Sequence, residues 1–438
     1  MLLQSLYALV DLAWVRSLGQ EAVAGLSISL QAFFIILAVS QVVATTALAE
    51  LSRAYGEGRV DDARGYASTF ALVGAGVGVV AAIAAYVAAP GYVDAFAPSA
   101  DVYDLGLGYF RVTTITFFSQ VLLVVLGNSL RASGDFLTPM IFMIVSVTLN
   151  AVLDPLLIFG VGPFPELGLD GAAWATAFAQ LVALGAYVLR LSRPSDRPRV
   201  LFFTRPRRPE AFFRRLVTRG LPAGVQFFLI SAVLGIVLAA VKPYGAAWTA
   251  TAGGGFRVLQ QAFLPLVAIG SAAAALTGQN LGARAPDRVR TTIHIALLAA
   301  VAYGVLAGLF FFAAGRGASF FFAEDDAGYD LGALYFRWSA PMLVAFALTY
   351  VPTFALQAAG RAVLPLMAAL VRVALLFVAI VVVIPAVDAD PVWIFGATTV
   401  TAFVEAALDF ALVERFLALI RREAAPLPSP QPAAADPP

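Results

Sequence analysis

Long apolar runs alternate with short polar segments along the whole of this chain. Windows of roughly 20 apolar residues, enough to cross a membrane as an α-helix, recur throughout it. They lie near residues 1–16, 24–49, 66–90, 107–131, 136–160, 168–190, 218–241, 249–277, 291–314, 333–358, 362–386 and 391–418. The runs are continuous and do not alternate at every second residue, which favours helices over a transmembrane β-barrel. The pattern predicts an all-α membrane protein with twelve transmembrane helices.

The composition indicates the same class. Of the 438 residues, 61% are hydrophobic and 13% are charged, which is too little polar surface to cover a soluble protein. The chain has no cysteine and a single histidine, His294, so disulfides are excluded and thiolate or histidine metal sites are disfavoured. We expect no cofactor and no structural metal. The net charge of +1 gives no indication of a nucleic-acid partner, and none is expected.

Arginine lies on one side of the predicted membrane. Arginine-rich segments occur near residues 53–64, 190–219, 284–290 and 415–422, and acidic segments without arginine near 94–104, 166–170 and 388–390. Loops rich in arginine stay in the cytoplasm. We therefore predict a multi-pass protein of the cytoplasmic (plasma) membrane of a prokaryote, with both termini in the cytoplasm.

The two halves of the chain match at a fixed offset of 226 positions. The matched pairs are Gly19 with Gly245, Gly56 with Gly282, Asp61 with Asp287, Arg64 with Arg290, and Pro139 with Pro365. One offset held without gaps over about 120 residues indicates an internal duplication. Because each half has an even number of spans, both keep the same orientation, and a pseudo-twofold axis along the membrane normal should relate them.

The duplication sets the expected domain boundaries. These are an N-terminal six-helix lobe at 1–190, a basic cytoplasmic linker at 191–217, a C-terminal six-helix lobe at 218–420 and a disordered cytoplasmic tail at 421–438. The second lobe starts its first span near Arg215, whose counterpart would precede Met1. A helix from Met1 to Arg16 spans only about 24 Å. We predict that the first helix is truncated and that Met1 is an internal start.

Several positions are polar in the first half and apolar in the second. Asn150 corresponds to Leu376, Asp154 to Ile380, Asp11 to Val237 and Gln4 to Ile230. By helix rise, Asp11 and Asp154 lie roughly 8 and 9 Å below the outer surface, Thr176 and Asn150 roughly 12 and 15 Å, and Gln4 roughly 18 Å. Tyr109 lies near the outer rim. These residues are predicted to line one outward-facing pocket.

Placing a carboxylate at this depth in the membrane costs free energy, and this cost suggests a function for Asp154 and Asp11. Insertion scales put that cost at about 2.5–3.5 kcal/mol, so such a group usually faces a cavity on an ion or substrate path. Burial favours the protonated carboxyl and a bound cation favours the anion, so the group can exchange a proton for a cationic ligand. Pro155 frees a backbone carbonyl and allows a bend beside the acid. The alternative is that Asp154 and Asn150 only join helices by hydrogen bonds.

The second half also has polar groups within its spans, and Arg257, Arg372 and Glu405 are secondary candidates. By the same depth count Arg372 and Glu405 can meet. A structural ion pair is the simpler interpretation, and a role in substrate binding or in closing the two bundles is the alternative.

Three stretches together resemble the multidrug and toxic compound extrusion (MATE) family of antiporters. They are LVDLAWVRSLGQEAVAGLSIS at 9, LRASGDFLTPM at 130, and NAVLDPLLIFG with ELGLDGAAWAT between 150 and 176. The resemblance covers essentially the whole chain apart from its start and tail. It implies two six-helix lobes that alternate access and export amphipathic, usually cationic compounds in exchange for H+ or Na+.

The resemblance also assigns roles to residues. In one branch of the family the coupling acids lie on the first and fifth helices, which Asp11 and Asp154 match. Gln4, Tyr109, Asn150 and Thr176 match neighbouring pocket positions, and Asn128 matches a further one. The other branch has acids on the seventh and tenth helices, and residues 218–241 and 333–358 contain none. The chain therefore resembles the branch with acids in the N-terminal lobe.

The functional prediction is a monomeric transporter, not an enzyme, that exports amphipathic cations through the lipid bilayer. Asp11 and Asp154 bind H+ or Na+, and occupancy changes the hydrogen bonding of the N-terminal lobe. A lipid-linked oligosaccharide flippase of the same superfamily is the main alternative, although it should have a strongly cationic cavity, for which Arg257 and Arg372 give little support. An intramembrane enzyme is a further alternative, but HExxH, cysteine and a second histidine are all missing.

Overall fold

The computed structural model describes residues 14–97, 99–192, 213–323, 325–387 and 389–424. Within these ranges the regular secondary structure is helical and no strand occurs. Nine described helices are long and apolar enough to cross a membrane, and one bent pair gives a tenth candidate. Most of the predicted span at 1–16, of the linker at 191–217 and of the tail at 421–438 lies outside the described residues.

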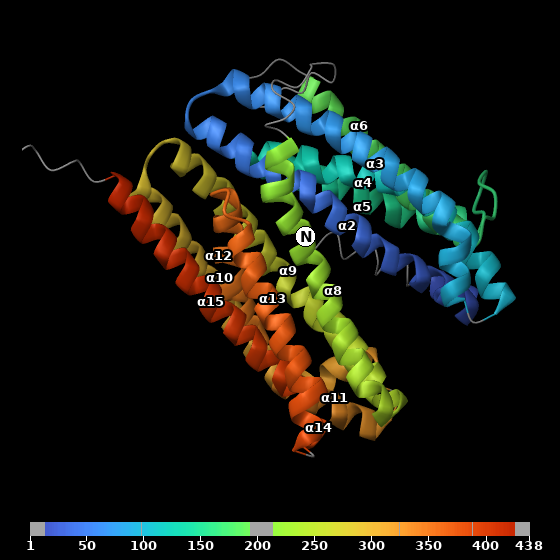
Figure 1. Cartoon of the computed structure of the whole chain (residues 1–438). Coiled ribbons are helices and arrows are strands. Elements are labelled where there is room, and N and C mark those ends of the chain that lie inside the picture. The colour runs from blue at the N-terminus through green and yellow to red at the C-terminus, as the bar shows by residue number, and fades with distance from the viewer. Residues whose placement is uncertain (1–13, 98, 193–212, 324, 388, 425–438) are drawn as a thin grey trace, which may run out of the picture.

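The helices form two groups (Figure 1). The first, here called the N-lobe, contains α2 (Gln20–Gly56), α3 (Val60–Phe96), α4 (Ala100–Ala132), α5 (Leu137–Ile158) and α6 (Leu169–Ser192). The second, the C-lobe, contains the π-turn η2 (Leu216–Gly220), α8 (Leu221–Val241), α9 (Ala246–Gly282), α10 (Pro286–Ala318), α11 (Asp326–Ser339), α12 (Met342–Ala358), α13 (Val363–Val378), the π-turn η5 (Ala379–Val383), α14 (Ile384–Ala386) and α15 (Trp393–Ala424).

The predicted duplication is present in the helix boundaries. Helices α2 and α9 each have 37 residues, and both their first and last residues differ by 226 in number. Each follows a glycine with a left-handed backbone, Gly19 at φ 104° and Gly245 at φ 101°. A side chain would be strained at that φ, so both repeats keep glycine at this turn. The two halves thus match in helix boundaries and also in the backbone angle φ of the glycine before the helix.

One predicted span is broken in the structure. The sequence predicts a single helix at 333–358, whereas α11 ends at Ser339, α12 begins at Met342, and the two are bent by 42°. Pro341 lies at the break and has no N–H to donate to the preceding turn. In contrast, α5 continues through Pro155 as one helix.

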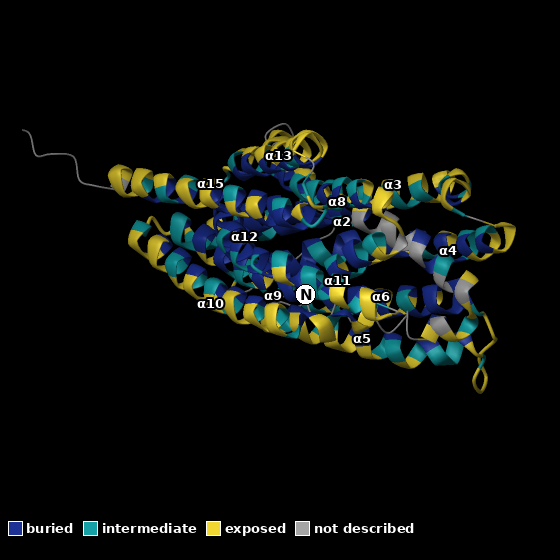
Figure 2. Ribbon diagram, turned by 90° about the horizontal axis from the view of Figure 1, so that it is seen from below, coloured by how far each residue is buried: buried dark blue, intermediate teal, exposed yellow. Residues whose placement is uncertain are grey.

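Burial differs sharply between inner and outer helices. The apolar window of α2 is 72% buried, whereas that of α3 is 22% buried and that of α10 28% buried. The exposed faces of the outer helices are apolar, for example Val80 and Val87 on α3 and Leu298 and Leu306 on α10. Figure 2 shows exposed residues along these outer helices. Such faces fit a lipid environment, because lipid tails are as apolar as the side chains.

The two lobes meet at one end and diverge toward the other (Figure 1). At the end where the lobes meet, α2 and α9 contact each other through glycines, which have no side chain to keep the helices apart. A Cβ on Gly56 would collide with the carbonyl of Gln279, and one on Gly282 would collide with the carbonyl of Arg53. Small residues allow the two backbones to approach this closely. The contact lies at the same end as the arginine-rich connections.

Candidate functional site

The acid that interrupts the apolar pattern of α5 is fully enclosed. Asp154 and Asn150 are each 0% exposed and lie one turn apart on the same face of the helix. The amide Nδ2 of Asn150 donates to Oδ1 of Asp154 over 3.1 Å. This contact places an amide dipole beside the carboxyl group, well inside the N-lobe.

Thr176 on α6 joins the same group. Nδ2 of Asn150 also donates to Oγ1 of Thr176 over 3.2 Å. We call Asn150, Asp154 and Thr176 the N-lobe polar cluster. Oδ1 of Asn150 accepts no hydrogen bond from the part of the chain that the structure describes. The cluster thus contains an acid, a hydroxyl and a buried amide oxygen that accepts from no described residue.

Tyr109 lies close to this cluster and packs against apolar side chains. It is buried on α4 and packs in a group that includes Leu26 on α2, Ile158 on α5 and Ala172 on α6. Ile158 is one turn beyond Asp154 on α5. The structure therefore brings Asp154, Asn150 and Thr176 together and places Tyr109 nearby, while Gln4 and Asp11 lie outside the described residues.

Close packing of α5 on α6 fixes the cluster. A Cβ on Gly171 would lie 2.5 Å from the carbonyl oxygen of Leu157, so α6 begins in direct backbone contact with the end of α5. Farther along, Oγ of Ser146 donates to the carbonyl of Ala179 over 2.8 Å. These two contacts hold both helices in register on either side of Asn150 and Thr176.

The predicted contact between Arg372 and Glu405 is present in the C-lobe. Nη1 of Arg372 lies 3.0 Å from Oε2 of Glu405, and both side chains are buried. The repeat counterparts of these residues are Ser146 and Ala179, which also touch each other. The ion pair thus replaces a neutral helix contact that the N-lobe makes at the same place.

A cavity of about 50 Å3 lies beside this ion pair. Its walls are largely aromatic, with Phe263, Phe346 and Tyr350 packed on one another. Its polar lining consists of Gln226, Thr349, Thr353, Gln357, Arg372 and Glu405. We call this space the C-lobe cavity.

Asn128 and Arg257, two further residues that the sequence suggests, lie elsewhere. Asn128 on α4 donates to the carbonyl of Ala44 on α2 over 3.1 Å and accepts from Arg131 over 2.7 Å, away from the N-lobe polar cluster. Arg257 on α9 is exposed and is not part of the lining of the C-lobe cavity. Among the described residues, no group of three or more His, Asp or Glu side chains is arranged to hold a metal ion.

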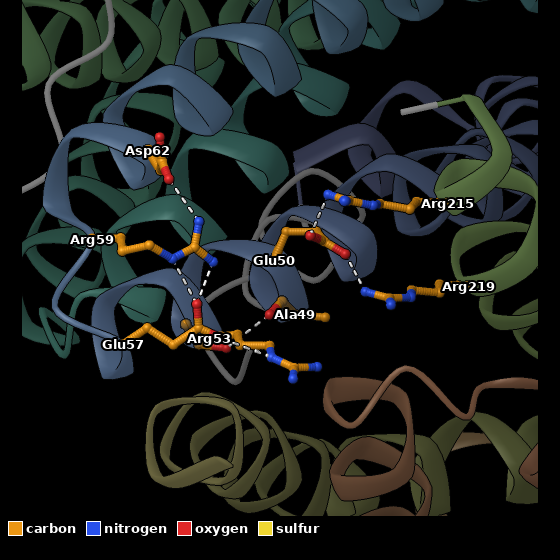
Figure 3. A network of polar contacts seen from close by, with 9 residues as sticks. Ala49, Glu50, Arg53, Glu57, Arg59, Asp62, Arg215 and Arg219 are labelled. Carbon is orange, nitrogen blue, oxygen red and sulfur yellow. Dashed lines mark hydrogen bonds and ion pairs between the residues drawn. The ribbon is translucent and has the colours of Figure 1, made fainter. Parts of the chain in front are cut away.

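A polar network at the meeting end of the lobes was not selected from the sequence. Glu50 on α2 accepts a hydrogen bond from Arg215 over 2.8 Å and also pairs with Arg219, so an N-lobe acid is held by two arginines of the C-lobe. Figure 3 shows this arrangement next to a second network around Glu57. In the sequence, Glu50 stands out as an acid among apolar residues near the end of α2. Its partners Arg215 and Arg219 could not be identified because they lie far away along the chain.

The chain is similar to proteins of known family over most of its length. The MatE family profile matches residues 1–156 and 222–383, which includes parts of both lobes. The "FAD transporter" of Shewanella oneidensis is 27% identical over 298 residues, which are 66% of this chain and 64% of that protein. The "Probable multidrug resistance protein YoeA" of Bacillus subtilis is 28% identical over 339 residues, 75% of this chain and 72% of that one. The match thus spans just under two thirds of the Shewanella protein's length.

Solved structures have the same fold. "Crystal structure of MATE in complex with MaL6" aligns with a TM-score of 0.87 at 19% identity, over 96% of this chain and 94% of that one. "Outward-facing conformation of a multidrug resistance MATE family transporter of the MOP superfamily" aligns with a TM-score of 0.86 at 20% identity, over 96% and 93%. These proteins contain twelve helices in two lobes. With the profile matching most of the sequence, the chain belongs to the MatE family of membrane transporters.

Proposed function

We propose that this protein is a secondary active transporter that exports amphipathic cations in exchange for H+ or Na+, with the coupling ion bound at Asp154. Asp11 is proposed as the second coupling acid, and Gln4 and Tyr109 as pocket residues, as the family resemblance implies. We further propose that the protein acts as a monomer in the cytoplasmic membrane of a prokaryote, with both termini in the cytoplasm.

The complete burial of Asp154 beside Asn150 and Thr176 carries the proposal. An ionised carboxylate that has lost its water needs a proton, a cation or several donors to offset the lost hydration. Nδ2 of Asn150 supplies one donor at 3.1 Å. The buried Oδ1 of Asn150 and Oγ1 of Thr176 are neutral oxygens suited to a small cation or to a protonated carboxyl group.

Binding of the ion would change the hydrogen bonds of α5. When Asp154 takes up a proton, its hydroxyl becomes a donor and Oδ1 of Asn150 is an available acceptor nearby. Because Asn150 also bonds Thr176, a change at Asp154 alters the contact between α5 and α6. This link is a physical route from ion occupancy to the shape of the N-lobe.

Alternating access is supported by the way the lobes meet. They are in contact where α2 meets α9 and diverge at the other end (Figure 1). We assign the contact to the cytoplasmic side, because the arginine-rich connections are there. In this state the diverging ends of the two lobes would face the outside.

The test uses purified protein in proteoliposomes, with a fluorescent cationic dye and an imposed pH gradient or Na+ gradient. We expect one of the two gradients to drive dye movement and Asp154→Asn to reduce it at least tenfold. Asp101→Asn, an exposed acid in the first turn of α4, is the control and should leave transport unchanged. Full gradient-driven transport by Asp154→Asn would reject the proposal.

Two other substrates belong in the same experiment. FAD is included because the Shewanella relative bears the name of an FAD transporter. A lipid-linked oligosaccharide has less support, because a pyrophosphate needs uncompensated cations. Arg372 is paired with Glu405, and Arg257 lies outside the C-lobe cavity.

A further inference from the structure

Two acids lie one turn apart inside the C-lobe. Glu405 and Asp409 occupy the same face of α15, and they are 4% and 0% exposed. Their repeat counterparts in the N-lobe are Ala179 and Ala183. The acids are therefore specific to the C-lobe and are not required by the repeated helix packing.

One arginine faces these two acids. Nη1 of Arg372 bonds Oε2 of Glu405 at 3.0 Å, which leaves Asp409 without an ion pair in the described part of the chain. Oδ2 of Asp409 accepts from Oγ1 of Thr353 over 3.2 Å, and Oδ1 accepts from no described residue. Asp409 is 0% exposed, so its ionised carboxylate would lose its hydration and gain only one hydroxyl donor in return. The protonated, neutral carboxyl group does not pay this desolvation penalty.

The adjoining C-lobe cavity has open hydrogen-bonding positions. Thr349 is 5% exposed, and its Oγ1 bonds to no described residue, nor does Nε of Arg372. Both residues line the cavity, as does Glu405. A space of about 50 Å3 with several polar partners can hold ordered water. These orphaned buried atoms point to water or another small polar occupant beside the acids.

A chain of side chains connects the cavity to Asp409. Nε2 of Gln357 donates to Oε1 of Gln226 over 3.0 Å, and Nε2 of Gln226 lies 3.5 Å from Oγ1 of Thr353. Thr353 in turn donates to Asp409. Because Thr353 lines the cavity, its hydroxyl gives cavity water a short polar path to the carboxyl group, and Gln226 and Gln357 hydrogen-bond around it.

We propose that Asp409 is a further proton-binding site of the transporter, located in the C-lobe and filled from the C-lobe cavity. The proton adds to the carboxylate of Asp409 and leaves to cavity water, and no other bond changes. A metal cation fits less well, because Thr353 is the one described side chain that bonds Asp409. The inference rests on the proposed function only in assigning this proton to the transport cycle.

The charged and titratable neighbours of Asp409 are few. Glu405 on α15, Arg372 on α13 and Tyr350 on α12 face the same region, and α8 contributes the neutral Gln226. From α10, His294 lies against Glu414, farther along α15 and partly exposed. The guanidinium that faces this region, that of Arg372, is already bound to Glu405.

The first measurement is the number of protons released when a cationic dye binds the purified protein in weakly buffered detergent solution. We expect Asp409→Asn to release fewer protons than the unmutated chain, and Asp154→Asn to release fewer as well if H+ is the ion that Asp154 binds. The double variant should release no more protons than either single variant. Asp101→Asn is again the matched control. Release unchanged in Asp409→Asn would overturn the inference, whereas release unchanged only in Asp154→Asn would overturn H+ as the ion bound at Asp154.

Infrared difference spectroscopy provides a readout that does not depend on transport. A protonated carboxyl group has a C=O stretching band that should be lost in Asp409→Asn, while Thr353→Val keeps the band but shifts the midpoint of its pH titration. A band that responds to neither pH nor dye would show a permanently protonated structural acid and would overturn the proposal. Thr353→Val also covers the case in which Asp409→Asn does not fold.

Discussion

The carboxylate of Glu50 on α2 accepts a hydrogen bond from the guanidinium of Arg215 over 2.8 Å, and this contact joins the two lobes of the transporter. Glu50 is nearly buried, and Arg219 binds its other oxygen. The same end of the molecule contains the glycine contacts between α2 and α9. Charge pairing and close backbone packing therefore both stabilise the arrangement in which the lobes touch at this end, here called the closed arrangement.

Glu50→Gln should open this end of the molecule more often. The variant keeps the shape of the side chain but removes the charge that holds two arginines. We expect a loss of about 1–2 kcal/mol in the closed state, a shift of roughly 5- to 30-fold in the ratio of closed to open molecules. Spin labels on cysteines at the exposed repeat partners Asp61 and Asp287 would report the distance between lobes, since the chain has no native cysteine.

Glu57→Gln is the matched control for that experiment. Glu57 pairs with Arg53 and Arg59, and all three belong to α2 and the turn that follows it. Partial burial raises the pKa of Glu57, but the hydrogen bonds from Arg59 and Arg53 outweigh it and lower the pKa overall. Its loss should leave the distance distribution unchanged. Equal distributions for Glu50→Gln and Glu57→Gln would contradict the role given to Glu50.

Gly282→Ala should also disfavour the closed arrangement, for a steric reason. The added methyl group would meet the carbonyl of Arg53 and lie 2.9 Å from the backbone nitrogen of Glu57. Backbone atoms cannot rotate away, so the lobes must separate at this point. Gly65→Ala in α3 is the control, because nothing lies within 4 Å of its Cβ position. We expect a longer inter-lobe distance and slower dye export for Gly282→Ala, with Gly65→Ala unchanged.

Much of the fold could be predicted because the duplication and the apolar runs reinforce each other. The offset that pairs Gly56 with Gly282 also pairs the ends of α2 and α9. The break between α11 and α12 was missed, since an apolar run looks the same whether or not its helix is bent. Pro341 was the local signal, yet Pro155 and Pro352 lie inside unbroken helices. A proline alone therefore does not determine where a span breaks.

The N-lobe polar cluster was easier to predict than the polar contacts between or within other helices. Asn150 and Asp154 stand out because helical spacing puts them on one face and their repeat partners are apolar. Glu50 and Asp409 gave weaker signals. Their partners, Arg215 and Thr353, lie on helices remote in sequence, and only packing brings them together.

Thr176→Val should weaken coupling without unfolding the N-lobe. Valine has nearly the shape of threonine but offers no acceptor to Nδ2 of Asn150, so a buried N–H loses a partner at a cost of about 1–3 kcal/mol. We expect a several-fold loss of gradient-driven dye export. Thr176→Ser retains the hydroxyl and should keep most of the activity. Equal export by the valine and serine variants would show that the hydroxyl is not needed.

Arg372→Met should destabilise the C-lobe more than any exposed arginine substitution. It leaves Glu405 buried without its partner, which typically costs about 3–5 kcal/mol. Adding Glu405→Gln removes the orphaned charge, so the double variant should recover most of the thermal unfolding midpoint. Arg316→Met is the control, because its partners Asp326 and Asp330 are exposed and such pairs contribute about 0–1 kcal/mol. If Arg372→Met costs no more than Arg316→Met, or if the double variant is less stable than the single one, the ion pair is not the stabilising contact inferred from its burial.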